Sequence, residues 1–128
     1  MAGQLAELDA LSNTPQPGTH GEVCVCRVQE RLRGYVCVEY RKWNRLGQVQ
    51  RLAVDPAFKR RGIATALVHR AEGFVRGKGG RGLYADTPVT NESGRNFYEA
   101  LDYRQAYVMP EYYDEGLDGV TYLKLFAA

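Results

Sequence analysis

Hydrophobic and polar positions alternate along two stretches in the first third of the chain. Residues 23–28 and 34–40 follow this period of two, which predicts two β-strands. The short connection ERLR between them favours an antiparallel hairpin. Ahead of the hairpin, leucines recur at helical spacing over residues 2–11 and predict a short amphipathic helix, and the turn-rich SNTPQPGTHG at 12–21 predicts a linker.

The middle of the chain reads as strand, helix and strand. A strand over residues 48–54 ends at Asp55-Pro56, and apolar residues at 3.6-residue spacing then predict a helix from about Arg61 to Arg76. The glycine-rich GKGGRG ends this helix. Leu83 to Asp86 is short and apolar enough to be a buried central strand.

The last third predicts a second helix followed by a hairpin. Asn91 or Ser93 can cap a helix that runs through Leu101, with Phe97, Ala100 and Leu101 facing inward. Two strands follow, near residues 104–109 and 119–126, joined by the polar loop PEYYDEGLDG.

This order of elements predicts the α/β class: a mixed sheet with an antiparallel N-terminal hairpin, a central strand-helix-strand-helix and a C-terminal hairpin. The crossovers are expected to be right-handed. A length of 128 residues fits a single domain over residues 1–128, with 1–21 as short helix and linker.

Charge is balanced overall but segregated along the chain. The net charge is +2, yet residues 41–81 hold eleven Lys or Arg against two acids, and residues 82–128 hold three against eight. This favours two different ligand-facing regions, with segregated solvated charge as the alternative. No apolar run approaches the roughly 20 residues of a membrane span and no signal peptide opens the chain, so we expect a cytoplasmic protein with no membrane partner.

The chain has three cysteines, Cys24, Cys26 and Cys37. An odd number without a secretory signal argues against a disulfide framework. No CxxC spacing or neighbouring histidine pair supports a metal site. We therefore expect core thiols and no bound metal.

The stretch VDPAFKRRGIATAL places three consecutive cations where a helix begins. A helix N-terminus already carries partial positive charge and free amides, so cations there cost energy unless an anion binds. Gly62 would let a phosphate approach the backbone, Arg60 and Arg61 would add charge-assisted bonds, and Thr65 adds a hydroxyl. The stretch therefore predicts a phosphate site, with a solvated basic cap as the structural alternative.

The motif is neither GxxxxGK[ST] nor GxGxxG. LAVDPAFKRRGIATALV instead resembles the acyl-CoA signature [Q/R]-x-x-G-x-[G/A] of the GNAT superfamily of N-acetyltransferases, with Lys59, Gly62 and Ala64 at its defined positions. Lys59 departs from the usual Gln or Arg, which keeps a donor but loses planar geometry.

A second segment also resembles this family. Its pattern N-x-x-A-x-x-F-Y-x-x-x-G-F is matched in register by NESGRNFYEALDY. Gly94 replaces Ala, Asp102 replaces Gly and Tyr103 replaces Phe, whereas Asn91 and Tyr98 are kept. The resemblance covers residues 22–126.

The resemblance implies acetyl transfer from acetyl-CoA to a primary amine by direct attack on the thioester. The third and central strands would splay and hold the pantetheine arm, and an amide of Leu52 or Val54 would polarise the thioester carbonyl, an effect of about 3 kcal/mol. Tyr98 matches the general acid that protonates the leaving thiolate, and a core aromatic is the alternative. Asn91 matches a cofactor-bonding position, although a helix cap explains it nearly as well. The implied cofactor-binding residues are Leu52, Ala53, Val54, Lys59, Arg60, Arg61, Gly62, Ile63, Ala64, Thr65 and Asn91.

The general base and the acceptor stay open at this point. Members of the family often place Glu on the third strand, where this chain has Gln48 and Gln50, and Glu39, Asp86, Glu111 and Asp114 remain candidates. The acidic, tyrosine-rich loop over residues 111–118 would suit a cationic small-molecule amine or a protein amino group, or is a solvated hairpin tip.

The region before the first hairpin is short for this family, which usually has a further strand and helix there. We therefore expect an open acceptor site or one completed by a second subunit, and predict a homodimer. A non-catalytic acyl-CoA-binding module is the alternative function. A nucleic-acid partner is not expected, because the cations cluster at a turn and do not interleave with exposed aromatics.

Overall fold

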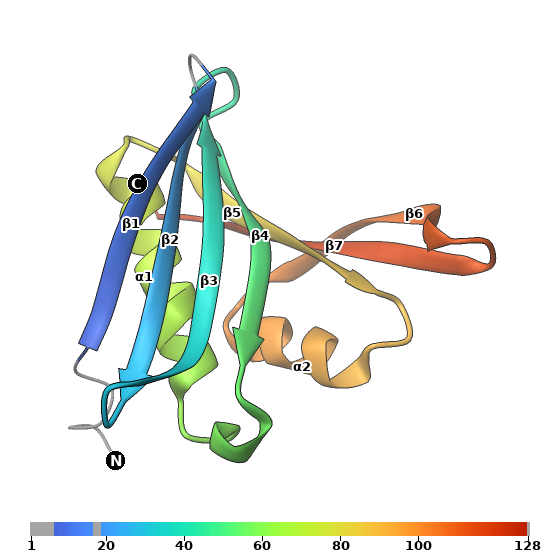
Figure 1. Ribbon diagram of the computed structural model, residues 1–128. Coiled ribbons are helices and arrows are strands. Elements are labelled where there is room, and N and C mark those ends of the chain that lie inside the picture. The colour runs from blue at the N-terminus through green and yellow to red at the C-terminus, as the bar shows by residue number, and fades with distance from the viewer. Residues whose placement is uncertain (1–6, 17–18, 128) are drawn as a thin grey trace.

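A computed structural model describes residues 7–16 and 19–127 of the chain (Figure 1). Within these residues the chain forms one seven-stranded mixed sheet, ordered β1-β2-β3-β4-β5-β7-β6, and two α-helices. The elements are β1 (Glu7–Gln16), β2 (Thr19–Val28), β3 (Arg31–Arg41), β4 (Leu46–Val54), a 3-10 turn η2 (Pro56–Phe58), α1 (Ile63–Gly77), β5 (Gly82–Pro88), α2 (Glu92–Ala100), β6 (Arg104–Asp114) and β7 (Leu117–Leu125). The predicted α/β class, both hairpins and the strand-helix-strand-helix centre are confirmed.

The N-terminal region is a strand, so the predicted helix and linker are wrong. β1 pairs antiparallel with β2, from Glu7 opposite Arg27 to Gln16 opposite Thr19. Residues 2–6 of the predicted helix lie outside the described residues. A ten-residue helix is only marginal by itself, and pairing with the edge of β2 satisfies the backbone over the same length. The short N-terminal region therefore supplies the further strand expected of the family.

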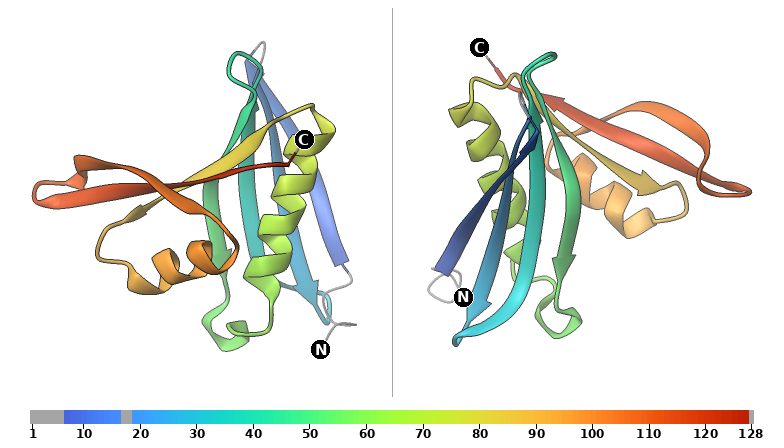
Figure 2. Two further views of the ribbon diagram at one scale, coloured as in Figure 1. Left: turned by 180° about the vertical axis from the view of Figure 1, so that it is seen from behind. Right: turned by 45° about the horizontal axis from the view of Figure 1, so that its top comes forward.

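The C-terminal hairpin is longer than predicted, and the expected loop over residues 110–119 is wrong. β6 and β7 continue almost to the tip, where Gly116 adopts a φ of +73°. Irregular pairing between Met109 and Asp114 absorbs the residues around Pro110. This polar segment is therefore part of a two-stranded arm that projects from the body of the molecule (Figures 1 and 2).

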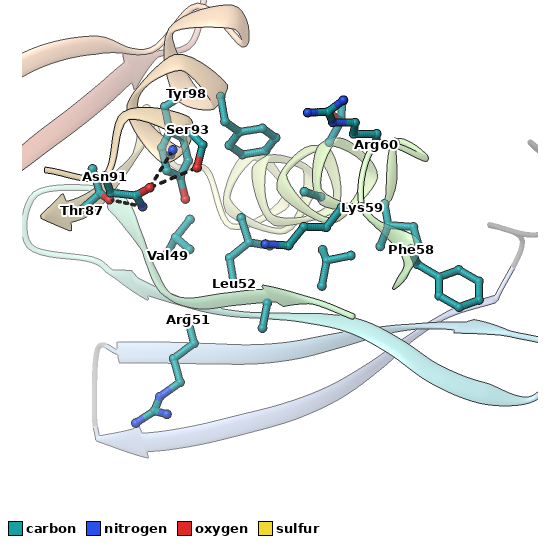
Figure 3. Close-up of a pocket in the computed structure, with 18 of the residues that line it drawn as sticks. Val49, Arg51, Leu52, Phe58, Lys59, Arg60, Thr87, Asn91, Ser93 and Tyr98 are labelled. Carbon is teal, nitrogen blue, oxygen red and sulfur yellow. Dashed lines mark hydrogen bonds between the residues drawn. The ribbon is translucent and has the colours of Figure 1, made fainter. Parts of the chain in front are cut away.

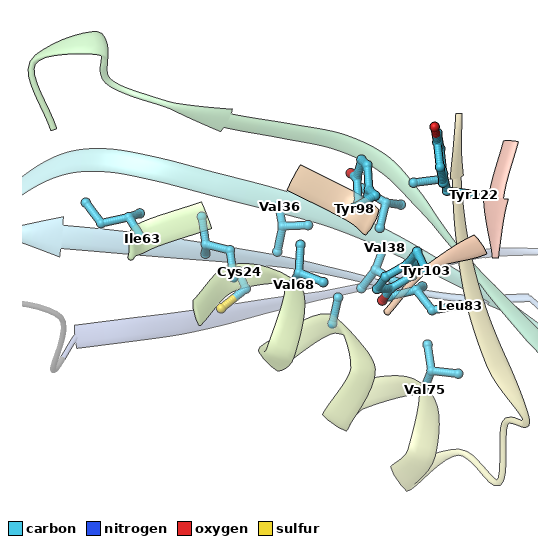
Figure 4. Close-up of a cluster of buried hydrophobic side chains, with 14 of the residues drawn as sticks. Cys24, Val36, Val38, Ile63, Val68, Val75, Leu83, Tyr98, Tyr103 and Tyr122 are labelled. Carbon is cyan, nitrogen blue, oxygen red and sulfur yellow. The ribbon is translucent and has the colours of Figure 1, made fainter. Parts of the chain in front are cut away.

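Helix α1 lies across one face of the sheet, close to β3 and β4. A Cβ at Gly47 would overlap the side chain of Val75, and one at Gly34 would lie 3.0 Å from Ile63. These glycines therefore allow the helix to approach the strands. Ile63, Leu67, Val68, Ala71 and Val75 are buried against Val36, Val38 and Leu83, as the apolar spacing predicts (Figure 4).

Helix α2 covers the same face, towards β7 (Figure 2). Its buried side chain is Tyr98, whereas Phe97 and Leu101 are half-buried and Ala100 is exposed. The predicted inward position of Ala100 is therefore wrong, because the helix turns the Tyr98 side to the core. The Tyr122 hydroxyl on β7 donates to Glu99 at 2.8 Å and accepts from Arg95 at 3.1 Å.

One buried polar cluster joins α1 to the base of the C-terminal hairpin. Glu72 is 8% exposed and accepts hydrogen bonds from the Tyr103 hydroxyl at 2.6 Å and from Lys124 at 3.3 Å. Burial, followed by the bond to Glu72, raises the pKa of Tyr103. The phenol therefore stays a donor to the carboxylate.

The three cysteines are free thiols. Cys24 and Cys26 are fully buried in the core, as predicted, and Cys37 is half-buried. In the described part of the chain no group of three or more His, Cys, Asp or Glu side chains is placed to hold a metal ion. None of its helices has the length and apolar character needed to cross a lipid bilayer.

Candidate active site

The sheet splits between its two parallel strands. β4 pairs with β5 only from Leu46 opposite Gly82 to Val49 opposite Ala85, although β4 runs on to Val54 and β5 to Pro88. The register of β4 against β3 shifts at the same point, where Gln50 is the extra residue. The splayed strands expected from the resemblance are thus present, and beyond Val49 one side of β4 faces a gap.

The gap between β4 and β5 opens into a cavity of about 620 Å³ (Figure 3). This volume is within the usual range for small-molecule sites. Its wall combines β4, the turn before α1, the end of β5 and the start of α2. Every residue predicted for the site lines it, with the exception of Arg61. The cavity therefore brings together two motifs that lie about thirty residues apart in the sequence.

The turn before α1 combines left-handed residues with amides that have no helical acceptor. Arg60 and Gly62 have φ values of +65° and +80°, and Gly62 caps the helix without a side-chain hydrogen bond. The first helical bond joins the Ala66 amide to the Gly62 carbonyl at 3.0 Å, so the preceding amides have no helical acceptor. Figure 3 shows the Lys59 side chain extending across the cavity towards Leu52.

Arg61 lies outside the cavity lining. Its guanidinium lies 4.6 Å from the centre of the Phe58 ring, which Arg33 also contacts at 4.3 Å. This cation–π contact holds the Arg61 head group at the turn. The basic stretch therefore supplies Lys59 and Arg60 to the cavity and uses Arg61 on its outer side.

Asn91 is both the cap of α2 and part of the cavity wall. Its Oδ1 accepts the Gly94 amide at 3.1 Å and the Ser93 hydroxyl at 3.2 Å, and its Nδ2 donates to Thr87 Oγ1 at 3.0 Å. The cap explanation of Asn91 is thus confirmed. The bond to Thr87 fixes the start of α2 to the end of β5, which is the edge of the cavity.

Tyr98 has its ring in the core and also lines the cavity. It is 6% exposed and packs against Phe97, Tyr103 and Tyr122 with ring centres 5.1, 5.5 and 6.2 Å away. Figure 3 shows it between α2 and β4, with its hydroxyl on the β4 side. Burial, with smaller contributions from Tyr113 and Asp86, raises the pKa of Tyr98 to about 12, so the phenol is protonated near neutral pH.

Of the four candidate bases, Asp86 lines the cavity and the other three lie outside its lining. Glu39 pairs with Arg41 at 3.0 Å. Glu111 and Asp114 accept backbone amides at the hairpin tip, from Gly116 at 3.2 Å and Glu115 at 2.8 Å. Among the four candidates, the cavity therefore contains only Asp86, at the carboxyl end of the short central strand.

Other lining residues were missed by the motif comparison: Val49, Gln50, Arg51, Phe58, Thr87, Ser93, Gly94 and Phe97. For Thr87 a signal does exist, because the carboxyl ends of parallel strands border the ligand crevices of α/β sheets. Arg51 is exposed and points away from the cavity in Figure 3.

Comparison with known proteins gives a consistent result. The chain is 29% identical over 77 residues to N-alpha-acetyltransferase 30 of Schizosaccharomyces pombe, and this alignment covers 60% of this chain and 51% of that protein. It is 33% identical over 107 residues to N-alpha-acetyltransferase 30 of Xenopus laevis, and this alignment covers 83% of this chain and 37% of that protein. The chain thus spans about half or less of the length of these two relatives.

Among solved structures, a protein of Bacillus anthracis described as a streptothricin acetyltransferase, in complex with acetyl coenzyme A, superposes with a TM-score of 0.78. The match covers 88% of this chain and 65% of that one at 14% identity, so it supports the fold. The model of the acetyltransferase (GNAT) family matches residues 5–103. The sequence motifs, the split sheet and this match agree: the chain belongs to the GNAT acetyltransferase family.

Proposed function

We propose that this chain is an N-acetyltransferase that moves an acetyl group from acetyl-CoA to a primary amine. The observation that carries the proposal is a single cavity that connects the positive-φ turn at Gly62 to Tyr98 through the split between β4 and β5. A phosphate-binding helix N-terminus at one end and a buried phenol at the other suit a long donor with a diphosphate and a reactive thioester.

The donor would be held mainly by backbone groups. The amides that precede Ala66 in the first turn of α1 have no helical acceptor, and the charges of Lys59 and Arg60 lie at the same turn of the cavity wall. Along the split, β4 has lost its β5 partner over residues 50–54, so backbone groups there can bond the pantetheine arm. An amide of Leu52 or Val54 directed at the thioester oxygen would contribute about 3 kcal/mol.

Tyr98 would act at the leaving sulfur. A phenol with a pKa of about 12 is a weaker acid than a thiol, whose pKa is about 8.5. Full proton transfer from Tyr98 to the thiolate is therefore unfavourable, and the phenol would stabilise the sulfur by donating a hydrogen bond. The proton that ends on sulfur would come from the amine after its attack.

A protein or peptide amino group is the acceptor class that we favour. Both helices of the described chain lie on one face of the sheet, and no described helix covers the opposite face of β3, β4 and β5, which is the side that would suit a bulky acceptor (Figure 2). The hairpin arm beside it carries four acids, Glu111, Asp114, Glu115 and Asp118, which suit a cationic amine. The two relatives named as N-alpha-acetyltransferases support the same class.

A thiol-release assay with acetyl-CoA tests the function. The panel holds a peptide with a free amino terminus, the same peptide already acetylated there, spermidine and an aminoglycoside. We expect CoA release with the free peptide and not with its acetylated twin. Calorimetric binding of acetyl-CoA without release on any amine would favour the acyl-CoA-binding module, and no binding at all would contradict both functions.

The predicted homodimer stays a prediction. The sequence-based argument for a dimer was that the N-terminal region is too short for a further strand and helix. β1 supplies that strand, which removes part of the argument. Light scattering at micromolar concentration measures the mass directly, and a monomer mass would contradict the dimer.

A further inference from the structure

We propose that Asp86 holds the amine of the acceptor opposite the thioester and takes up its proton, a role for which Gln48 and Gln50 on β4 offer no carboxylate. This inference rests on the proposed function, because it concerns the same cavity and the same reaction. The base of the reaction would then lie on β5, and residues of the neighbouring strands β4 and β7 would orient its carboxylate.

Asp86 lies at the point where the sheet opens. It follows Ala85 directly, and Ala85 is the last β5 residue paired with β4. Leu83 and Ala85 are buried on the α1 side, so the alternation along β5 directs Asp86 to the opposite face. Asp86 and Tyr98 both line the cavity, the first from the open face and the second from α2.

The carboxylate and the phenol lie within electrostatic reach of each other. After burial and the Tyr113 hydroxyl, the charge of Asp86 is the third cause that raises the pKa of Tyr98 to about 12. It also contributes to raising the pKa of Tyr113 to about 12, after burial. One phenol from α2 and one from the hairpin arm therefore lie near the same negative charge.

Two neighbouring strands present donors to this carboxylate. The Thr121 hydroxyl on β7 donates to Asp86 Oδ1, and Gln48 Nε2 on β4 donates to Oδ2 at 3.2 Å. A carboxylate offers about four acceptor positions on its two oxygens. Two are used by these strands, so acceptor positions remain for a ligand in the cavity that Asp86 lines.

The orientation of the Gln48 amide follows from its own partners. Its Oε1 accepts from both terminal nitrogens of Arg41, each at 3.2 Å, and from Gln50 Nε2 at 3.1 Å. Because arginine has no acceptor, the amide oxygen must face Arg41 and the amide nitrogen must face Asp86. Arg41 is held in turn by Glu39 at 3.0 Å and by the Tyr84 hydroxyl at 3.1 Å.

The chemistry balances with the groups present. An incoming ammonium gives one proton to the Asp86 carboxylate, and the neutral amine then attacks the thioester carbonyl carbon. The carbon–sulfur bond breaks, a second proton passes from nitrogen to sulfur beside the Tyr98 hydroxyl, and Asp86 returns its proton to solvent. The products are the acetylated amine and free CoA.

The variant Asp86→Asn tests this role with the free peptide as acceptor. We expect kcat/KM for the peptide to fall by about 100-fold near pH 7, the lower range for loss of a catalytic base. The Kd of acetyl-CoA in calorimetry should stay within about twofold of the wild-type value, which shows that the fold and the donor site are intact. Asp102→Asn removes an exposed carboxylate outside the cavity lining and should change the rate by less than about twofold.

The pH profile of the wild-type and Asp86→Asn rates distinguishes a role of Asp86 in proton removal from a purely structural role. A peptide α-amino group has a pKa of about 8, so above that pH the acceptor is already neutral and needs no base. The ratio of wild-type to Asp86→Asn rates should therefore shrink as pH rises. The double variant Asp86→Asn, Gln48→Glu keeps one carboxylate and one amide at the same contact and should recover part of the lost rate.

Three results would overturn the inference. The first is an Asp86→Asn enzyme that transfers acetyl at the wild-type rate, and the second is a defect of constant size across pH. The third is a double variant no faster than the single one although it binds acetyl-CoA normally. A wild-type protein inactive on every amine would instead overturn the proposed function, and this inference with it.

Discussion

The Asn91 carboxamide occupies the space that a side chain at position 94 would need. Asn91 Oδ1 accepts the Gly94 amide at 3.1 Å, and a Cβ built on Gly94 would overlap Asn91 Nδ2. The same Nδ2 donates to Thr87 at 3.0 Å. The family pattern has alanine at this position, so in this chain the cap of α2 and the glycine depend on each other.

Gly94→Ala should therefore lower the free energy of unfolding by about 1 kcal/mol, since loss of the cap outweighs the gain in helix propensity. Gly73→Ala is the matched control, because a Cβ there meets open space on the solvent-exposed side of α1 and should stabilise the fold by up to about 1 kcal/mol. Urea unfolding measures both. Equal stabilisation of the two variants would show that Asn91 moves aside without cost.

Gly62→Ala should weaken acetyl-CoA binding. Gly62 has a φ of +80° and nothing lies within 4 Å of an added Cβ, so the effect is conformational and not steric. The left-handed conformation costs an L-residue about 1–2 kcal/mol, which corresponds to a Kd increase of about five- to thirtyfold if the turn relaxes.

Gly62→Asn controls for this, because asparagine tolerates the left-handed region better, and its calorimetric Kd should lie between those of wild type and Gly62→Ala. Identical affinities for all three proteins would argue against an anion site at this turn.

Tyr98→Phe should lower kcat by about 100-fold and leave the Kd of acetyl-CoA within about twofold, because the ring packing stays and one hydrogen bond to the leaving sulfur is lost. Steady-state thiol release and calorimetry separate the two quantities. Tyr35→Phe, on β3 and outside the cavity lining, serves as the control. A parallel loss of rate and binding in Tyr98→Phe would assign Tyr98 to packing alone.

Tyr98 should also destabilise the fold at alkaline pH. Its pKa is raised to about 12 in the folded protein, whereas an unfolded tyrosine titrates near 10. Its neutral form is thus favoured by folding, and this stability is present below pH 10 and is lost as pH rises towards 12. Between about pH 9 and 11, wild type should lose about 1 kcal/mol more than Tyr98→Phe in urea unfolding.

Other tyrosines with raised pKa values, Tyr84 and Tyr113 among them, are present in both proteins and cancel in this difference. Equal alkaline losses would show that the Tyr98 hydroxyl is better hydrated than its burial implies.

The parts of the site that depend on neighbouring residues in the sequence could be predicted. These are the glycine turn at Gly62 with the start of α1, and the Asn91 cap of α2. Asp86 could be named only as one of four candidate bases, because its environment comes from Gln48 and Thr121 on two other strands. Sequence spacing does not show which strands become neighbours.

The same reason explains the errors at the two ends of the chain. β1 and the outer part of β6 are strands because each pairs with a neighbour, β2 or β7, and not because of a clear alternation of their own. Their sequences, with evenly spaced leucines in one and four acids near the other, favour helix and loop when read in isolation.

The contacts of Glu72 with Tyr103 and Lys124 have a mechanical consequence for the hairpin arm. They fasten both strands of the arm at its root, immediately before β6 and near the end of β7, to α1, the helix whose first turn lines the cavity. With its root fixed in this way, we expect the arm to bend beyond the root, towards its tip. We therefore expect the tyrosines near that tip to change position more easily than α1 does.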